Sequence, residues 1–158
     1  MIKTTYILFI LIILSGSSCQ DDIGELYEGD YLVFGSFYGF CVGDDCLQLF
    51  KLEDRQLLED TVAQYYTEDN LFQRSNRVRS RAELNTAKSL LDVFPKQLLK
   101  ERDSTFGCPD CYDQGGFYIE YKQGRKRGTW VIDRTQDDVP AYLHEFMDRV
   151  DEVIRQLQ

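Results

Sequence analysis

Short runs of alternating apolar and polar residues occur in two separate parts of the chain, and they predict two groups of β-strands. The first group is rich in aromatic and branched residues and turns at 42–45 and 53–56, and the second turns at 123–125. The predicted strands cover 31–34, 37–38, 47–49, 57–58, 117–121 and 129–132. Residues 60–79 show neither the strand period nor the helix period, so they are predicted to form a loop.

Two stretches have the spacing of amphipathic helices. Ser80 and Glu83 form a capping box at the start of the first helix, and Pro95 ends it. The second helix is entered through Asp138 and Pro140 and carries charged residues opposite its apolar stripe. The apolar positions are Leu84, Ala87, Leu91 and Phe94 in the first helix, and Leu143, Phe146, Met147, Val150, Val153, Ile154 and Leu157 in the second.

The order strands, helix, strands, helix predicts the α+β class. We expect an antiparallel sheet of about five strands, built from two hairpin or meander units. Two main helices should cover one face, and the other face should be partly exposed to solvent. The chain has 158 residues, and the predicted elements place one domain at 31–158.

The first residues have the pattern of a secretory signal peptide. Lys3 supplies a positive start, 6–14 is an apolar run too short to span a bilayer, and small residues at 15–18 precede Cys19. This arrangement resembles the lipobox of bacterial lipoproteins, with Gly16 where that family usually has leucine. The following sequence, 19–22, resembles the acidic export signal of Bacteroidetes-type lipoproteins.

The resemblance implies a signal peptide at 1–18, lipidation of Cys19 and an acidic tether at 19–30. The protein would then be an outer-membrane lipoprotein, periplasmic or surface-exposed, held to the membrane by its acyl chains. A noncleaved membrane anchor is the alternative. The formal net charge of −9 disfavours binding to nucleic acid or to anionic lipid headgroups.

Four cysteines remain besides Cys19, an even number that favours disulfides in an exported protein. We expect local pairs, Cys41 with Cys46 across a turn and Cys108 with Cys111, although loop entropy favours a bridge between the two halves. One alternative is a zinc site formed by all four thiolates. Another is thiol redox chemistry at Cys108 and Cys111, but a strand rather than a helix follows this pair, so no helix dipole is available to stabilise a thiolate.

Spacing alone identifies no catalytic set, because His144 is the only histidine. The basic cluster 125–127 and the aromatic and glycine run 34–40 are explained as a solvated turn and as core. No cofactor is expected unless the cysteines bind zinc. The expected function is a non-catalytic binding module for an unknown protein, peptide or glycan ligand. Protease inhibition is an alternative, because the order hairpin then helix is similar to small bacterial metalloprotease inhibitors.

Overall fold

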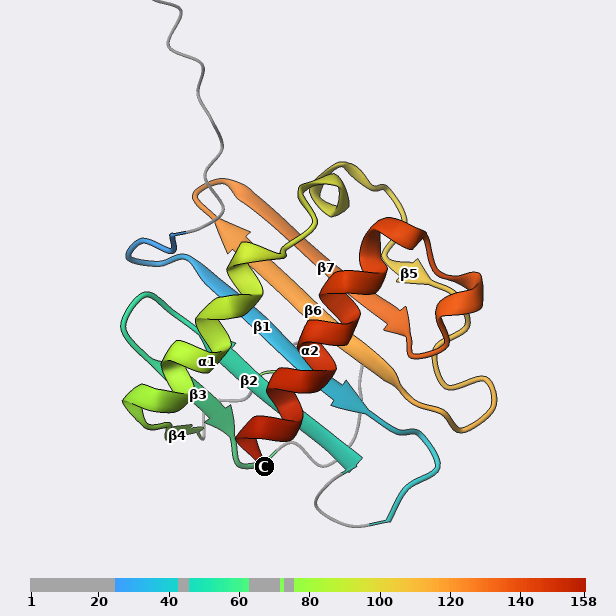
Figure 1. The fold of residues 1–158 in the computed structure, drawn as a ribbon, viewed down its shortest axis with the longest axis horizontal. Coiled ribbons are helices and arrows are strands. Elements are labelled where there is room, and N and C mark those ends of the chain that lie inside the picture. The colour runs from blue at the N-terminus through green and yellow to red at the C-terminus, as the bar shows by residue number, and fades with distance from the viewer. Residues whose placement is uncertain (1–24, 43–45, 63–71, 73–75) are drawn as a thin grey trace, which may run out of the picture.

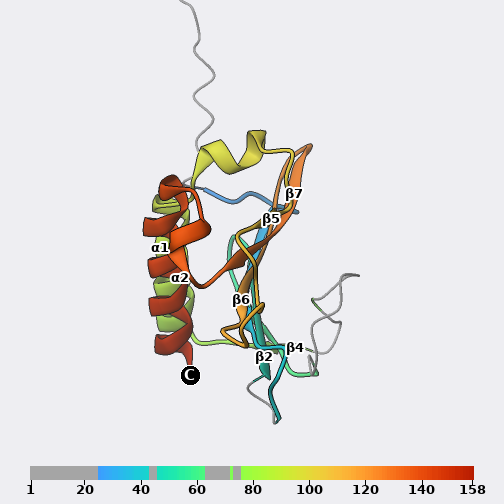
Figure 2. The same ribbon diagram turned by 90° about the vertical axis from the view of Figure 1, so that its right-hand side faces the viewer.

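The computed structural model describes residues 25–42, 46–62, 72 and 76–158. The predicted signal peptide, the lipidation site Cys19 and the start of the predicted tether lie outside the described residues. Within them the chain forms an α+β fold in which two helices pack side by side on one face of a single sheet (Figures 1 and 2).

The described residues form a sheet of seven strands in the order β4-β3-β2-β1-β6-β7-β5. The strands are β1 (Tyr31–Phe37), β2 (Leu47–Leu52), β3 (Leu57–Asp60), β4 (Asn76–Val78), β5 (Thr105–Phe106), β6 (Gly116–Gln123) and β7 (Lys126–Asp133). The central pair is β1 with β6, where Phe34 lies opposite Ile119. This antiparallel pair joins the two predicted strand groups into one sheet.

The prediction of about five antiparallel strands was only partly right. Both edge strands were missed, and β5 pairs with β7 in parallel, so the sheet is mixed. The edge strand β4 has three residues, all of them exposed, and it lies in the segment predicted as loop. In β5 only Phe106 is buried. Strands this short have too few residues to show an alternation, and their tertiary pairing fixes them instead.

Helix α1 (Arg81–Asp92) begins with the predicted capping box. The Ser80 amide donates to the Glu83 carboxylate at 2.7 Å, and the Glu83 amide donates to the Ser80 hydroxyl at 3.3 Å. These hydrogen bonds lower the pKa of Glu83 to about 2. All four predicted apolar positions from Leu84 to Phe94 are buried, together with Leu90.

Every residue of the second predicted apolar stripe is buried: Leu143 directly precedes helix α2 (His144–Leu157), and the other six lie within it. Short 3₁₀ helices connect the longer elements, among them η2 (Lys96–Lys100), η3 (Gln136–Asp138) and η4 (Ala141–Leu143). Phe94 stands at the centre of the helix–sheet core, with its ring 4.5 Å from that of Tyr121 and 5.4 Å from that of Phe146. Aromatic packing therefore holds the helical layer against the sheet.

The opposite face of the sheet is partly exposed, as expected, with Arg127 and Thr129 of β7 exposed on it. It also carries a second buried cluster: Val33, Phe37, Leu47, Leu49 and Tyr118, with Phe72 packed against it. Beside this cluster the Glu120 carboxylate is buried. It accepts hydrogen bonds from Tyr31 at 2.6 Å and from Arg127 at 2.8 Å. Burial and the hydrogen bond to Glu120 raise the pKa of Tyr31 to about 12.

The segment before β1 packs onto the domain. Leu26 is buried in the main core, and the Asp30 carboxylate accepts from the Tyr27 and Gly124 amides. Residues 25–30 therefore contact the body of the domain, although the sequence assigns them to the tether. Within the described residues, no helix is both long and apolar enough to cross a membrane.

Candidate functional site

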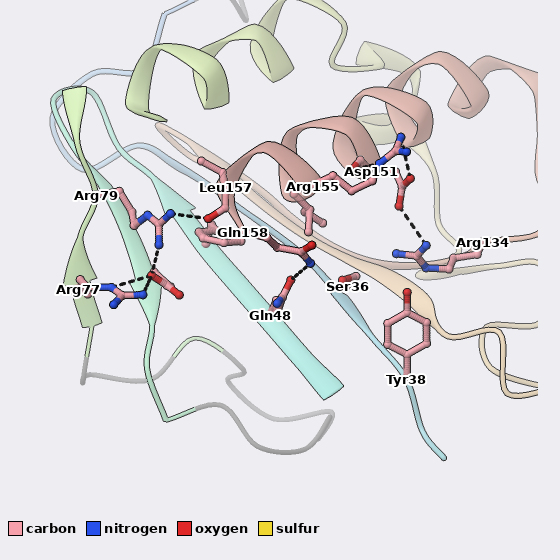
Figure 3. A pocket seen from close by; sticks show the side chains of 13 residues that line it. Ser36, Tyr38, Gln48, Arg77, Arg79, Arg134, Asp151, Arg155, Leu157 and Gln158 are labelled. Atoms are coloured by element: carbon pink, nitrogen blue, oxygen red, sulfur yellow. Dashed lines mark hydrogen bonds and ion pairs between the residues drawn. The ribbon is translucent and has the colours of Figure 1, made fainter. Parts of the chain in front are cut away.

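A polar cavity of about 630 Å³ opens where the C-terminal end of α2 passes over the ends of β1 and β2 (Figure 3). Along β1, the helix-facing side chains are Leu32, Phe34 and then Ser36. Ser36 lies opposite Gln48 of β2. The helix-facing surface of the sheet thus changes from apolar to polar at the position where α2 ends, which leaves a polar cavity beside the core.

Four arginines line this cavity, which we call the arginine pocket. They are Arg77, Arg79, Arg134 and Arg155. The acidic side chains among the lining residues are Glu59 and Asp151, so the lining side chains carry a formal charge of +2. The whole chain has a formal net charge of −9. The pocket is therefore a local concentration of positive charge in an acidic protein.

Arg79 forms one end of the pocket, just beyond β4. Its side chain is 14% exposed and donates to Glu59 at 2.7 Å, to Glu83 and to the carbonyl oxygen of Leu157 at the end of α2. Its guanidinium lies 6.0 Å from the centre of the Phe50 ring. Burial lowers the pKa of Arg79, but the hydrogen bonds to Glu59 and Glu83 outweigh this effect and raise it. Arg79 is thus a fixed cation.

Arg134 forms the other end of the pocket, just beyond β7. Its Nη1 donates to Asp151 of α2 at 3.0 Å, and its guanidinium lies 4.7 Å from the ring centre of Phe117 and 5.0 Å from that of Tyr38. In the described part of the chain, its other two guanidinium nitrogens have no hydrogen-bond partner, and Nε is buried. Arg134 is held in place with unused hydrogen-bond donors.

The other two arginines are more exposed. The side chain of Arg77 is 62% exposed and pairs with Glu59 at 2.6 Å, whereas that of Arg155 is 68% exposed and pairs with Asp151 at 3.2 Å. Each carboxylate therefore holds one fixed arginine and one exposed arginine. Exposed pairs of this kind contribute little to stability, so the outer arginines can reorient toward a ligand at low energetic cost.

Neutral polar groups form the floor between the two ends. Ser36 is 3% exposed and is one of the residues that line the cavity. The amide of Gln158 donates to the side-chain oxygen of Gln48 at 2.9 Å across the floor. These neutral side chains make the floor polar, so it suits a polar ligand or water rather than an apolar one.

The structure joins the cysteines in the two expected local pairs, Cys41 with Cys46 and Cys108 with Cys111. Their Cα atoms are 5.4 and 5.5 Å apart. Among the described residues, which include all four of these cysteines, no group of three or more histidine, cysteine, aspartate or glutamate residues is placed to hold a metal ion. The four sulfurs are not brought together as the zinc alternative requires.

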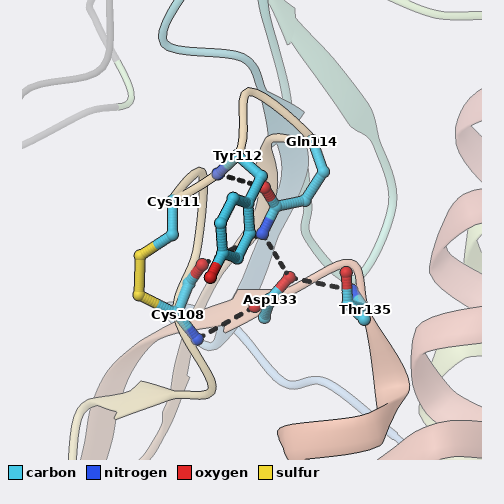
Figure 4. The surroundings of a disulfide bond; sticks show 6 residues. All are labelled: Cys108, Cys111, Tyr112, Gln114, Asp133 and Thr135. Atoms are coloured by element: carbon cyan, nitrogen blue, oxygen red, sulfur yellow. Dashed lines mark hydrogen bonds between the residues drawn. A yellow bond between two sulfur atoms is a disulfide. The ribbon is translucent and has the colours of Figure 1, made fainter.

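Asp133 fixes the loop that contains the second disulfide (Figure 4). Its buried carboxylate accepts from the Cys108 amide at 2.9 Å, from the Gln114 side chain at 2.9 Å and from the Thr135 amide at 2.8 Å. Burial raises the pKa of Asp133, but these hydrogen bonds outweigh it and lower the pKa. No helix begins at this cysteine pair, so its setting favours a structural role over thiol redox chemistry.

The end of β1 and the residues after it, up to Gly39, contact the loop that contains the second disulfide, beside the arginine pocket. A β-carbon at Gly39 would overlap the carboxylate of Asp110, and one at Gly115 would overlap the carbonyl oxygen of Phe37 and the ring of Tyr38. Gly115 also has a φ of +75°, which favours glycine. The second loop therefore supports Tyr38, which forms one wall of the pocket.

The other sequence candidates lie elsewhere. His144 contacts the carbonyl oxygen of Val139 at 2.9 Å. The basic cluster 125–127 lies at the turn between β6 and β7, where Arg127 pairs with Glu120. Phe34 and Phe37 are core residues, whereas Phe40 of the same run is 87% exposed.

Sequence reasoning missed all four pocket arginines. Arg77 and Arg79 lie in the segment predicted as loop, Arg155 was assigned to the charged face of the last helix, and Arg134 had no assignment. Only the order of strands in the sheet brings these separate segments together, so no local spacing could have revealed the pocket. The chain matches no protein-family model and no curated protein, so its function has to be inferred from the pocket itself.

Proposed function

We propose that the protein is a lipid-anchored, non-catalytic binding module of the bacterial outer membrane, and that it captures an anionic ligand in the arginine pocket. The observation that carries this proposal is the convergence of four guanidinium groups on one cavity with only two carboxylates among its lining side chains. Guanidinium groups present paired N–H donors that match the oxygens of carboxylates, sulfates and phosphates.

The arrangement supports binding rather than catalysis. Arg79 and Arg134 are held by carboxylates and aromatic rings, so they are in place before a ligand arrives. Glu59 and Asp151 each hold two arginines, an arrangement that suits positioning of cations better than proton transfer. The pocket lining contains no histidine or cysteine.

The signal-peptide pattern and Cys19 support the proposed location at the outer membrane. A lipid on Cys19 would hold the domain at the membrane through the segment before residue 25. A Cys19→Ser variant tests the anchor. This variant should no longer incorporate labelled fatty acid and should appear in the soluble fraction. A variant that is still labelled and membrane-bound would contradict the proposed anchor.

Anion titrations of the mature chain at constant ionic strength test the binding proposal. Citrate, sulfate and phosphate, titrated against chloride as reference, should raise the melting temperature, and calorimetry should give a dissociation constant for at least one of them. Arg155→Gln should weaken that binding about fivefold or more, because it removes an exposed donor of the pocket. Arg149→Gln is the matched control. Arg149 lies on the same helix outside the pocket and pairs with Glu152 at 3.2 Å. The proposal fails if no anion binds more tightly than chloride, or if the two variants bind alike.

A further inference from the structure

We infer that the ligand of the arginine pocket is an acidic sugar at least two residues long, with carboxylate groups that reach both ends of the pocket. This inference rests on the proposed anion-binding function and goes beyond it, because it names the class of molecule. Three features of the pocket carry it: the separation of its two fixed cations, the polar floor between them and its aromatic wall.

The two fixed guanidinium groups lie on the same face of the sheet, the one covered by α2, and approach the pocket from the directions of its two opposite edges (Figure 3). Arg79 follows β4 and Arg134 follows β7, and four strands lie between these two in the sheet order. With strands about 4.8 Å apart and side chains reaching inward from both sides, the two guanidinium groups are on the order of 10 Å apart. One phosphate or sulfate ion cannot contact both, so the ligand that uses both carries two separated anionic groups.

The body of the ligand has to be polar. Between the two ends lie the hydroxyl of Ser36 and the amide pair of Gln48 and Gln158. Apolar side chains in the lining are few: Phe50, Ile154 and Leu157. An acyl chain or a large apolar peptide side chain would cover this polar floor without offering it any hydrogen bond, which is unfavourable. A hydroxylated body supplies donors and acceptors to them.

The cavity volume of about 630 Å³ greatly exceeds that of a single inorganic anion and suits a ligand of a few rings. Tyr38 forms one wall with its ring beside Arg134. Flat aromatic side chains on supported loops are surfaces on which the apolar faces of sugar rings can pack.

Calorimetric titration of the mature chain with four probes tests the inference. The probes are a uronic acid trisaccharide, a neutral trisaccharide with the same linkage, a tri-glutamate peptide and inorganic sulfate. The acidic trisaccharide should bind at least about tenfold more tightly than each of the others, since it alone supplies both the anionic groups and the hydroxyls.

Two serine variants examine the floor. Ser36→Ala should lower the affinity for the acidic trisaccharide about three- to tenfold, because the hydroxyl of Ser36 is expected to bind the sugar. Its melting temperature without ligand should equal that of the unsubstituted chain, and its affinity for sulfate is measured alongside. Ser89→Ala on α1, where the hydroxyl donates to the Thr86 carbonyl oxygen, should change neither affinity.

The outcomes separate the inference from the function on which it rests. If sulfate or the acidic peptide binds as tightly as the acidic trisaccharide, the inference is wrong and the anion-binding proposal stands. If the neutral trisaccharide binds equally well, the acidic groups are irrelevant and the inference is wrong. If none of the charged probes binds, the proposed function itself fails.

Discussion

Gly39 lies directly against the carboxylate of Asp110, with no room for a β-carbon between them. The same carboxylate accepts a hydrogen bond from the Gly115 amide at 2.9 Å, and Gly115 in turn lies against Tyr38. These close contacts therefore connect the loop that contains the second disulfide to Tyr38, which forms a wall of the arginine pocket.

Gly39→Ala should lower the free energy of unfolding by about 1–3 kcal/mol, because the added methyl group displaces the Asp110 carboxylate. Chemical denaturation measures this change. Asp110→Gly removes the obstacle and tolerates the φ of 63° at that position. In the Asp110→Gly background, Gly39→Ala should lower the free energy of unfolding much less. Equal costs in both backgrounds would show that the two residues are not coupled.

Peptide mapping of the unreduced protein should find each disulfide within a single tryptic peptide. No lysine or arginine lies between Cys41 and Cys46 or between Cys108 and Cys111, so each peptide should be lighter than its reduced form by two hydrogen masses. A crossing bond between the two halves would instead link two peptides. Replacing Cys108 and Cys111 together by serine should cost about 2 kcal/mol of stability on the loop-entropy account.

Arg79→Ala should destabilise the fold by about 2–4 kcal/mol. The substitution leaves Glu59 with a single, exposed partner and removes the donor to the Leu157 carbonyl oxygen at the end of α2. Arg77→Ala is the matched control, because Arg77 pairs with the same Glu59 but is 62% exposed, and it should cost less than about 1 kcal/mol. Equal losses for the two variants in urea denaturation would contradict the fixed role of Arg79.

Acid should weaken the fold through Glu83. Its pKa is lowered from 4.5 to about 2 by the hydrogen bonds with Ser80, so the ionised carboxylate stabilises the folded state. This contribution is complete above pH 4.5 and is lost as the pH falls toward about 2. Glu83→Gln should flatten the dependence of stability on pH in that window. An unchanged pH profile for Glu83→Gln would show that the capping box does not contribute in solution.

The sequence predicts the helices and the central strands well, because their signals are local. Ser80 and Glu83 identify the start of α1, and the stripe from Leu143 to Leu157 identifies α2. The second buried cluster was not predicted, because Tyr118 and Glu120 are the polar positions in the alternation of β6, although both are buried. Polar groups on a strand do not mark it as exposed when they hydrogen-bond to each other, as Tyr118 and Glu120 do at 3.2 Å.

The candidate site could not be predicted in this way. Arg79 and Arg134 are 55 positions apart in the sequence. They line the same pocket only because β1 pairs with β6. The edge strand that positions Arg77 and Arg79 has three exposed residues and no periodic pattern. By contrast, the local cysteine pairs agree with expectation because a turn alone brings their Cα atoms close.

The arginine side-chain Nε–H signals of the mature chain, followed by NMR during titration with a uronic acid trisaccharide, test the central claim most directly. The signals of Arg77, Arg79, Arg134 and Arg155 should shift in a saturable manner, and those of Arg125 and Arg149, which lie outside the pocket, should stay in place. Saturable shifts in sulfate alone would still support anion binding. If the four pocket signals remain unchanged with every anion, or if all arginines shift alike, the arginine pocket is not the binding site.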